Sequence, residues 1–93
     1  MAIQSFRHKG LQRFFLTGSK AKIQAKHASR LRLILGRLHV ATERKDMDLP
    51  GLVLHELKGR RKGTWSIRVS GNWRLTFRFV GKDVDGGNYE DYH

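Results

Sequence analysis

The chain has 93 residues, 39% of them hydrophobic, and its 19 Lys and Arg against 8 Asp and Glu give a formal net charge of +11. This length suits one domain covering residues 1–93, and the absence of cysteine excludes disulfides, thiol nucleophiles and zinc–thiolate sites. No apolar run is long enough to span a membrane and no signal peptide is recognisable, so we expect a cytoplasmic protein without a membrane partner.

The beginning of the chain predicts a short strand and a helix. Residues 1–6 alternate in the manner of a strand, and residues 8–16 have apolar side chains at helical spacing. Those apolar residues are Leu11, Phe14 and Phe15. Gly18 is suited to end this helix, because glycine readily adopts the left-handed conformation found after helix C-termini.

Residues 23–42 have the clearest helical pattern in the chain, with apolar side chains on one face. The apolar positions are Ala28, Leu31, Ile34, Leu35 and Leu38. The reverse side is basic apart from Leu33, and it carries Lys22, Lys26, Arg30 and Arg37. A charged reverse side is usually solvated, but a face with one sign of charge also suits a phosphate backbone or an acidic partner.

After this helix the periodicity changes to that of strands. A connector over residues 43–51 ends in Pro50-Gly51, a turn signal, and residues 52–57 then predict a short strand that carries His55. Further strands are expected over residues 65–70, 73–79 and 84–92. The last strand contains Gly86-Gly87, which we expect to loosen it.

These elements indicate an α+β fold in which N-terminal helices pack on one face of a small, mainly antiparallel, twisted sheet. The large apolar residues that alternate along the strands would face the helices. They are Trp65, Ile67, Val69, Trp73, Leu75, Phe77 and Phe79. The opposite face is left to Arg68, Arg74 and Arg78 and would be open to a partner.

The net charge points to a polyanionic partner, because so large an excess of one sign destabilises a compact fold. Nucleic acid is the leading candidate, ahead of an acidic protein. An anionic membrane surface fits less well, because no basic amphipathic helix has Trp or Phe on its opposite face. Candidate RNA-binding residues come from a basic loop over residues 58–63 and from the polar face of the sheet. They are Arg60, Arg61, Lys62, Arg68 and Arg78.

Ionisable side chains from three separate parts of the chain are expected near the same polar face. They are His55, Lys58, Arg74, Asp91, Tyr92 and His93. Cleaving RNA without a metal needs a base for the 2′-hydroxyl, cations for the phosphoryl oxygens and an acid for the departing 5′-oxygen, and these residue types can fill those roles. Each residue taken singly has a simpler explanation, as a solvated or salt-bridged surface side chain or part of a solvated tail.

Motifs for other chemistries are not found. The five histidines are scattered without the spacing of metal ligands, so we expect no metal and no other cofactor. The glycines at positions 59 and 63 bound only a basic turn, and no serine lies in a nucleophile elbow. No DNA-reading helix-turn-helix is recognisable.

Six segments spread over nearly the whole chain share the pattern of one known family. They are Ser5-Phe6-Arg7-His8-Lys9-Gly10-Leu11, Asp48-Leu49-Pro50-Gly51, His55-Glu56-Leu57-Lys58-Gly59, Trp65-Ser66-Ile67, Gly71-Asn72-Trp73-Arg74-Leu75-Thr76-Phe77 and Asn88-Tyr89-Glu90-Asp91-Tyr92-His93. In these segments the chain resembles the HigB toxins, which belong to the RelE superfamily of bacterial toxin–antitoxin systems. The resemblance implies a RelE-like fold and metal-independent endonuclease action on mRNA held by translating ribosomes.

The resemblance also implies a protein partner and roles for the site residues. The partner would be a HigA-type antitoxin with a helix-turn-helix domain, so operator DNA would be met only through the complex. His55 and Asp91 would activate the 2′-hydroxyl, and His93 would protonate the leaving group. The remaining residues would stabilise the phosphate (Lys58 and Arg74) or orient the nucleotide (Tyr92). Which residue is the acid and which the base stays open.

Three positions depart from the family pattern. Glu56 stands where relatives often have proline, Thr64 where many have a bulky residue, and Gly86-Gly87 where a more strand-like pair is usual. Two alternatives therefore accompany the enzyme hypothesis. One is a non-catalytic basic module that binds RNA or the ribosome, and the other is an inactive toxin that acts only with its antitoxin in repression.

Overall fold

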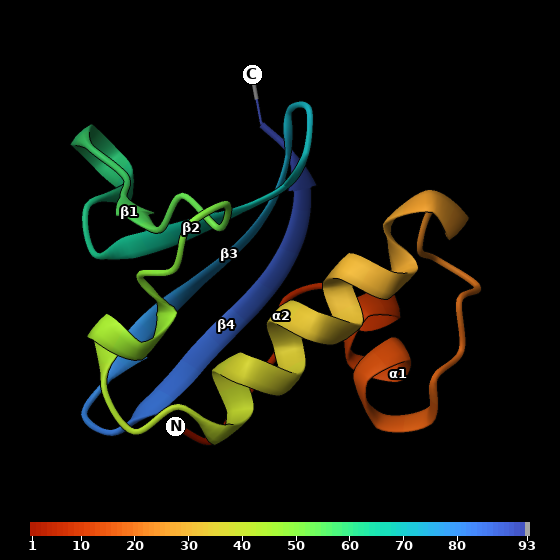
Figure 1. Ribbon diagram of the computed structural model, residues 1–93, viewed down its shortest axis with the longest axis horizontal. Coiled ribbons are helices and arrows are strands. Elements are labelled where there is room, and N and C mark those ends of the chain that lie inside the picture. Colours follow the sequence, from red (N-terminus) through yellow and green to blue (C-terminus); the bar gives the residue numbers. More distant parts are fainter. Residues whose placement is uncertain (93) are drawn as a thin grey trace.

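The computed structural model describes residues 1–92, which form two helices packed against a four-stranded antiparallel sheet (Figure 1). The helices are α1 (Lys9–Thr17) and α2 (Ala28–Val40), and the strands are β1 (His55–Glu56), β2 (Thr64–Ser70), β3 (Trp73–Val80) and β4 (Asp83–Asp91). Short 3₁₀ turns lie between them at η1 (Ala25–His27), η2 (Arg44–Met47) and η3 (Gly59–Arg61). The strands are neighbours in chain order, so the sheet is a meander and the predicted α+β fold is confirmed.

Helix α1 begins and ends where the sequence supplies caps. The Nδ1 atom of His8 accepts a hydrogen bond from the Leu11 N–H at 2.9 Å, which satisfies one backbone donor of the first turn. Gly18 adopts the left-handed conformation (φ 80°) and donates its N–H to the Phe14 carbonyl at 2.8 Å, so the predicted helix end is confirmed. Between these caps the helix buries Leu11 and Phe14, and each such side chain contributes roughly 1.5–3 kcal/mol to folding.

Helix α2 is shorter than the predicted span of residues 23–42. Gln24 has extended backbone (ψ 129°) before η1, and Ala41 is extended (ψ 144°) at the other end, so the chain leaves the helical conformation at both places. The apolar positions predicted for its inner face are all buried, whereas Leu33 on the reverse side is 49% exposed. The sequence pattern therefore identified the face correctly and the length incorrectly. No helix within residues 1–92 is long and apolar enough to cross a bilayer.

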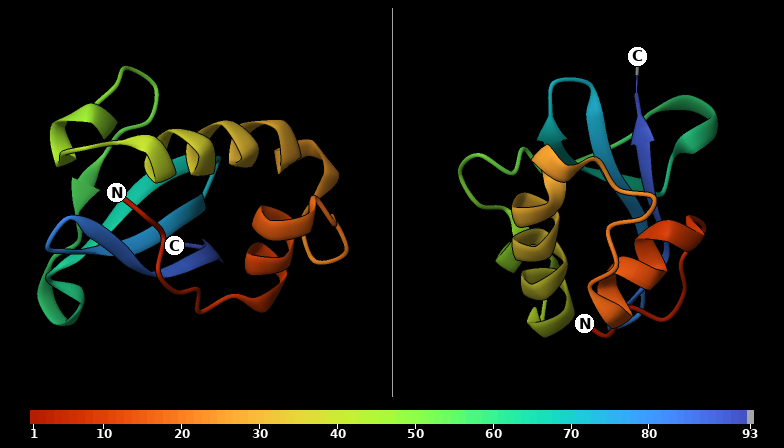
Figure 2. Two further views of the ribbon diagram at one scale, coloured as in Figure 1. Left: turned by 90° about the horizontal axis from the view of Figure 1, so that it is seen from below. Right: turned by 90° about the vertical axis from the view of Figure 1, so that its right-hand side faces the viewer.

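The hydrophobic core lies between the helices and the inner face of the sheet. Ile67, Leu75 and Phe77 are at most 1% exposed and come from the alternating positions predicted to face the helices. The segment with η3 lies on the other side of the sheet from α2 (Figure 2). One face of the sheet is thus covered by helices, and the other carries a basic connecting segment.

Strand β1 contains two residues, where a strand over residues 52–57 was predicted. Val53 has a positive φ of 52°, which is rare for a β-branched residue and breaks the extended conformation just before His55. Leu52 instead closes a turn, with its N–H bound to the Leu49 carbonyl at 3.1 Å. Only His55 and Glu56 form ladder pairs with β2, although the Leu52 carbonyl still accepts the Arg68 N–H at 2.9 Å.

The N-terminal segment, predicted as a strand over residues 1–6, makes two isolated parallel bridges with β4, Ile3 to Val84 and Phe6 to Gly87. Gly86 has a positive φ of 68°, and a Cβ on Gly87 would lie 3.1 Å from the Phe6 ring. The glycine pair is therefore required for the close approach of the N-terminal segment. Strand β4 is continuous from Asp83 to Asp91, but its register with β3 shifts between the pairs Thr76–Asn88 and Arg78–Asp85, so a bulge lies at this glycine pair. The expected loosening is therefore confined to a local interruption of the ladder.

Candidate functional site

Cross-strand pairing arranges polar side chains in two rows on the face of the sheet turned away from α2. The first row is His55, Ser66, Thr76 and Asn88, and the second is Arg68, Arg74 and Glu90. Ser66 and Thr76 are each 1% exposed, because the segment containing η3 folds over this side of the sheet (Figure 2). The floor of the candidate site is therefore polar but dry.

A shallow pocket of about 260 Å³ opens at the end of this face, and we call it the His55 pocket. It is lined by His55, Glu56, Leu57, Lys58 and Tyr92. The strand β1 supplies the histidine, the start of the following loop supplies Lys58, and the chain beyond β4 supplies Tyr92. Three of the predicted catalytic residues, which are up to 37 positions apart in sequence, thus share one pocket.

The hydrogen bond made by His55 decides which ring nitrogen carries the hydrogen. Its Nδ1 atom lies 3.1 Å from the Val53 carbonyl oxygen, which can only accept, so Nδ1 carries the hydrogen. The neutral ring then leaves Nε2 with a lone pair available as a base. Val53 is the residue with the positive φ, so a strained backbone supplies the carbonyl that sets this tautomer.

The loop between β1 and β2 is closed by the carboxylate of Glu56. Its Oε2 atom accepts the Gly63 N–H at 2.8 Å, and the Leu57 N–H donates to the Thr64 carbonyl at 2.8 Å. The carboxylate that departs from the family pattern beside His55 therefore belongs to the loop. It fixes the backbone on either side of Lys58 and η3.

An ion pair that the sequence did not predict joins this loop to β4. Arg61 donates two parallel hydrogen bonds to Glu90, from Nη1 to Oε1 at 2.7 Å and from Nη2 to Oε2 at 2.8 Å. Glu90 also accepts the Thr76 hydroxyl at 2.6 Å and the Asn88 amide at 3.2 Å. The Arg61 guanidinium and these donors lower the pKa of Glu90 to about 2, against the effect of burial.

Arg61 consequently has its charge satisfied within the protein, although its position in the basic loop predicted RNA binding. Its guanidinium also lies 5.9 Å from the centre of the Tyr92 ring, within the range of a cation–π contact. The signal available in the sequence was the alternation of β4, which puts Glu90 on the same side as Asn88. The alternation does not say which of many cations would reach it.

Two other predicted site residues, Arg74 and Asp91, do not line the pocket. Arg74 donates from Nη1 to the carbonyls of Gly71 at 2.5 Å and Trp73 at 3.1 Å, so its guanidinium rests on the turn between β2 and β3. Asp91 is exposed at the end of β4, in register with Trp73. His93 lies outside the described residues.

The predicted RNA-binding residues other than Arg61 are exposed. Arg68 is the register partner of Arg74, and two like charges directly opposite each other on neighbouring strands destabilise a sheet unless an anion lies between them. Arg78 packs its guanidinium against Gly63, and Lys62 lines a second shallow pocket together with Lys58. Arg60 lies in η3. Within residues 1–92, no group of three His, Asp or Glu side chains is placed to hold a metal ion.

Comparison with known proteins gives two matches that cover nearly the whole chain. Residues 4–93 match the family described as the RelE-like toxin of the type II toxin–antitoxin system HigB. The chain is also 43% identical, over 91 residues, to the Endoribonuclease HigB of Proteus vulgaris, a match that covers 98% of this chain and 99% of that protein.

Proposed function

The chain belongs to the family of RelE-like HigB toxins of type II toxin–antitoxin systems, and we propose that it is a ribosome-dependent endonuclease of mRNA. The Proteus vulgaris relative supports endonuclease action on RNA, since it is called an endoribonuclease. The observation that carries the proposal is the His55 pocket, where a histidine held through Nδ1 by the Val53 carbonyl lines one surface with a lysine and a tyrosine. These are the residue types that metal-independent cleavage of RNA requires.

In this proposal the reaction is an internal transfer at phosphorus. The Nε2 atom of His55, assisted by Asp91, takes the proton of the 2′-hydroxyl, and the 2′-oxygen forms a bond to the adjacent phosphorus. The bond to the 5′-oxygen breaks, and His93 gives that oxygen a proton. The products are a 2′,3′-cyclic phosphate and a 5′-hydroxyl.

The cations around the pocket would act on the negative charge that grows on the phosphoryl oxygens. Lys58 lines the pocket and can reach those oxygens directly. Arg74 would have to leave the carbonyls of the neighbouring turn to do so. Tyr92 is 38% exposed and would orient or stack on the nucleotide. The exposed cations Arg60, Lys62, Arg68 and Arg78 would follow the RNA backbone, and Arg61 would act through the loop that it holds.

The proposal extends to partners and location. The substrate would be mRNA held by the translating ribosome in the cytoplasm, and a HigA-type helix-turn-helix antitoxin would neutralise the toxin. Operator DNA would be bound only by the complex with that antitoxin, because residues 1–92 offer two helices that pack on a sheet and no DNA-reading motif. One toxin domain over residues 1–93 would suffice for these functions.

The test compares mRNA cleavage on translating ribosomes by the unmodified chain and by His55→Ala, His93→Ala and His39→Ala. Removing a proton-transfer group should slow cleavage by about 10²–10⁴-fold while cosedimentation with ribosomes persists. His39 is an exposed histidine on α2, far in sequence from the pocket, and its variant should cleave normally. Mapping of the products should find 5′-hydroxyl ends beside cyclic or 3′-phosphates.

Three results would count against the proposal. Cleavage that survives both His55→Ala and His93→Ala would remove the assigned roles. Ribosome binding without cleavage by the unmodified chain would favour the non-catalytic module, and absence of growth arrest on expression without antitoxin would favour the inactive toxin.

A further inference from the structure

The net positive charge of the chain is concentrated in the part that does not form the His55 pocket. Residues 1–42 contain nine Lys and Arg and no Asp or Glu, and the first acidic residue is Glu43. The ion pairs between Lys45 and Glu43 and between Arg61 and Glu90 both belong to the later part. Residues 1–42 therefore carry most of the net charge of +11, although the proposed chemistry lies on the far side of the sheet.

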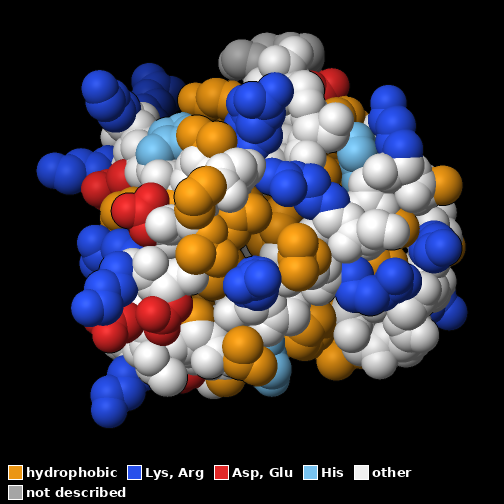
Figure 3. All heavy atoms as spheres, viewed as in Figure 1, with side chains coloured by type: hydrophobic (Ala, Val, Ile, Leu, Met, Phe, Trp, Pro, Cys, Tyr) orange, Lys and Arg blue, Asp and Glu red, His pale blue; other side chains and the backbone are white. Residues whose placement is uncertain are grey.

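The space-filling view shows the same separation. Most of the visible Asp and Glu side chains gather along the left margin and one lies at the top, whereas none is visible over α1 and α2 (Figure 3). In Figure 1, β1 lies at the left and α1 at the right, so the His55 pocket and the first helix are at opposite ends of the molecule. A polyanion bound at α1 would not compete with one in the pocket.

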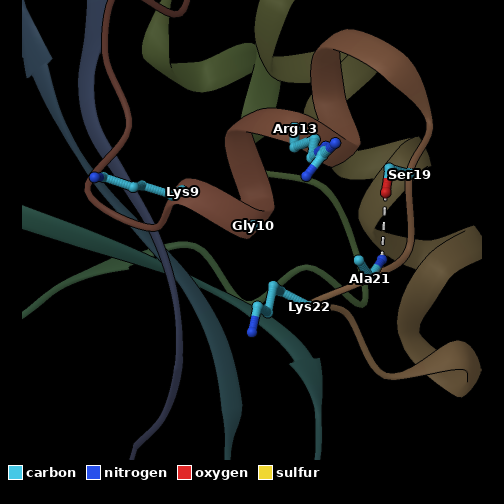
Figure 4. Close-up of a pocket in the computed structure, with 6 residues that line it drawn as sticks. All are labelled: Lys9, Gly10, Arg13, Ser19, Ala21 and Lys22. Carbon is cyan, nitrogen blue, oxygen red and sulfur yellow. Dashed lines mark hydrogen bonds between the residues drawn. The ribbon is translucent and has the colours of Figure 1, made fainter.

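A local packing arrangement places Lys22 beside the two cations of α1, Lys9 and Arg13. A Cβ on Gly10 would lie 2.2 Å from the Cβ of Lys22, so the Lys22 stem packs directly on the first turn of the helix. Lys9, Arg13 and Lys22 then line a pocket of about 170 Å³ together with Gly10, Ser19 and Ala21 (Figure 4). The first turn of α1 has no acidic residue, so the positive end of its dipole adds to these charges.

The directions of these side chains indicate the shape of the ligand. The charged ends of Lys9, Arg13 and Lys22 point away from one another around Gly10 (Figure 4). They do not converge on one small anion, and they suit several phosphates along a backbone. The exposed apolar residues of the two helices that could anchor a protein, Leu16, Leu33 and Val40, do not line this pocket.

We propose that Lys9, Arg13 and Lys22 form a second RNA-binding surface, the α1 surface, which binds the phosphate backbone of a structured RNA while the His55 pocket holds a different strand. For the ribosome-dependent toxin proposed above, on which this last identification rests, that structured RNA is ribosomal RNA. The α1 surface binds the toxin to the ribosome and takes no part in the cleavage reaction.

The test measures binding to a labelled RNA hairpin as a function of salt concentration, for Lys9→Gln/Lys22→Gln and for a control that removes the same amount of charge. The control is Lys45→Gln/Lys82→Gln, which removes two exposed lysines outside both sites. The slope of log affinity against log salt falls by roughly 0.7–0.9 for each phosphate that the protein no longer neutralises, so the first variant should reduce it by about 1.4–1.8. The control should keep the slope of the unmodified chain.

Cleavage on ribosomes supplies the second readout. Lys9→Gln/Lys22→Gln should raise KM several-fold at unchanged kcat, and thermal unfolding should verify that it is folded. Equal changes of slope in both variants would mean that net charge alone drives binding and would overturn the proposal. An unchanged slope with weaker antitoxin binding would assign the surface to an acidic protein instead. If the unmodified chain does not cleave, the proposed function fails, and the hairpin slopes still decide this inference.

Discussion

At the scale of single residues, Glu90 connects the two sides of the His55 pocket. Its partner Arg61 follows Lys58 by three positions, and Glu90 itself precedes Tyr92 by two. Two parallel hydrogen bonds of 2.7 and 2.8 Å between them fix the loop that carries Lys58 against the strand that leads to Tyr92. The pair therefore positions Lys58 and Tyr92, which we propose contact RNA, without itself being part of that contact.

We predict that Glu90→Gln lowers kcat for mRNA cleavage about tenfold or more and leaves KM nearly unchanged. The amide keeps the shape but cannot accept both hydrogen bonds of Arg61, so the loop and Tyr92 lose their fixed separation, and misplacement of this kind costs rate rather than binding. The free energy of unfolding should also fall, by roughly 1–3 kcal/mol. Cleavage kinetics and urea unfolding measure the two effects, with the exposed carboxylate variant Asp48→Asn as the control.

The same variant has a distinct dependence on pH. The pKa of Glu90 falls from 4.5 to about 2 on folding, so its contribution to stability is complete above pH 4.5 and is lost as the pH falls towards 2. The unmodified chain should therefore lose more stability over that range than Glu90→Gln does. Parallel curves for the two chains would show that the carboxylate does not stabilise the fold.

Site residues within the family-pattern segments could be predicted from the sequence, whereas contacts that depend on the path of a loop could not. His55, Lys58 and Tyr92 belong to segments with the family pattern, and the structure puts them in one pocket. The Arg61–Glu90 pair was missed, because the partner of a carboxylate depends on the path of a loop and not on local spacing. The same loop path sends the carboxylate of Glu56 to Gly63.

At the scale of elements, the N-terminal segment and β4 determine each other's conformation. The Gly87 N–H donates to the Ser5 carbonyl at 3.0 Å, and the Gly87 carbonyl accepts the Arg7 N–H at 2.8 Å. The Gly86 N–H donates to the Ser5 hydroxyl at 2.9 Å. These bonds cover the outer edge of β4 up to Gly87 and leave the stretch that leads to Tyr92 paired with β3.

Replacing Gly87 with alanine should destabilise the protein by about 1–3 kcal/mol, because the new Cβ would lie 3.1 Å from the Phe6 ring and the backbone is held on both sides. Gly36→Ala is the matched control and should stabilise the protein. A Cβ there meets nothing within 4 Å, and the residue lies inside α2, where alanine is favoured over glycine by about 0.5–1 kcal/mol. Chemical unfolding of both variants checks the pair, and a neutral Gly87→Ala would contradict the close packing.

Element boundaries were predicted less well than element faces. The apolar stripe of α2 was correct because burial follows the helical period, but the helix ends depend on backbone torsions at Gln24 and Ala41 that composition does not determine. Strand β1 is short because Val53 adopts a positive φ, which no propensity predicts for valine. The role of Gly86-Gly87 needed knowledge of the segment that packs on it.

At the scale of the whole molecule, the fold class followed from the change of period after residue 42, since helices that precede a run of strands must bury their apolar stripe on one face of the sheet. The one histidine buried between these layers, within the described residues, was not anticipated. His27 in η1 is 2% exposed and shares a hydrogen bond of 2.5 Å between its Nδ1 and the Tyr89 hydroxyl of β4. Its Nε2 has no partner among the described residues.

This histidine should make the stability of the whole domain sensitive to mild acid. Burial, and then the nearby charge of Lys26, lower the pKa of His27 below its ordinary value of 6.5. The unfolded chain therefore binds a proton at His27 more readily than the folded chain does. The contribution of neutral His27 to folding stability is complete above pH 6.5 and is lost as the pH falls below it. The slope can reach about 1.4 kcal/mol per pH unit.

We predict that His27→Gln, which cannot take up the proton, removes most of the loss of stability between pH 6.5 and 5. Urea unfolding at a series of pH values measures it, and His39→Gln, which changes an exposed histidine, should keep the loss. The absolute stability of His27→Gln will be lower, because the bond to Tyr89 is weakened, but only the slope tests the argument. If the dependence of stability on pH were unchanged in His27→Gln, the loss of stability in acid would have another cause, such as mutual repulsion within a chain of net charge +11.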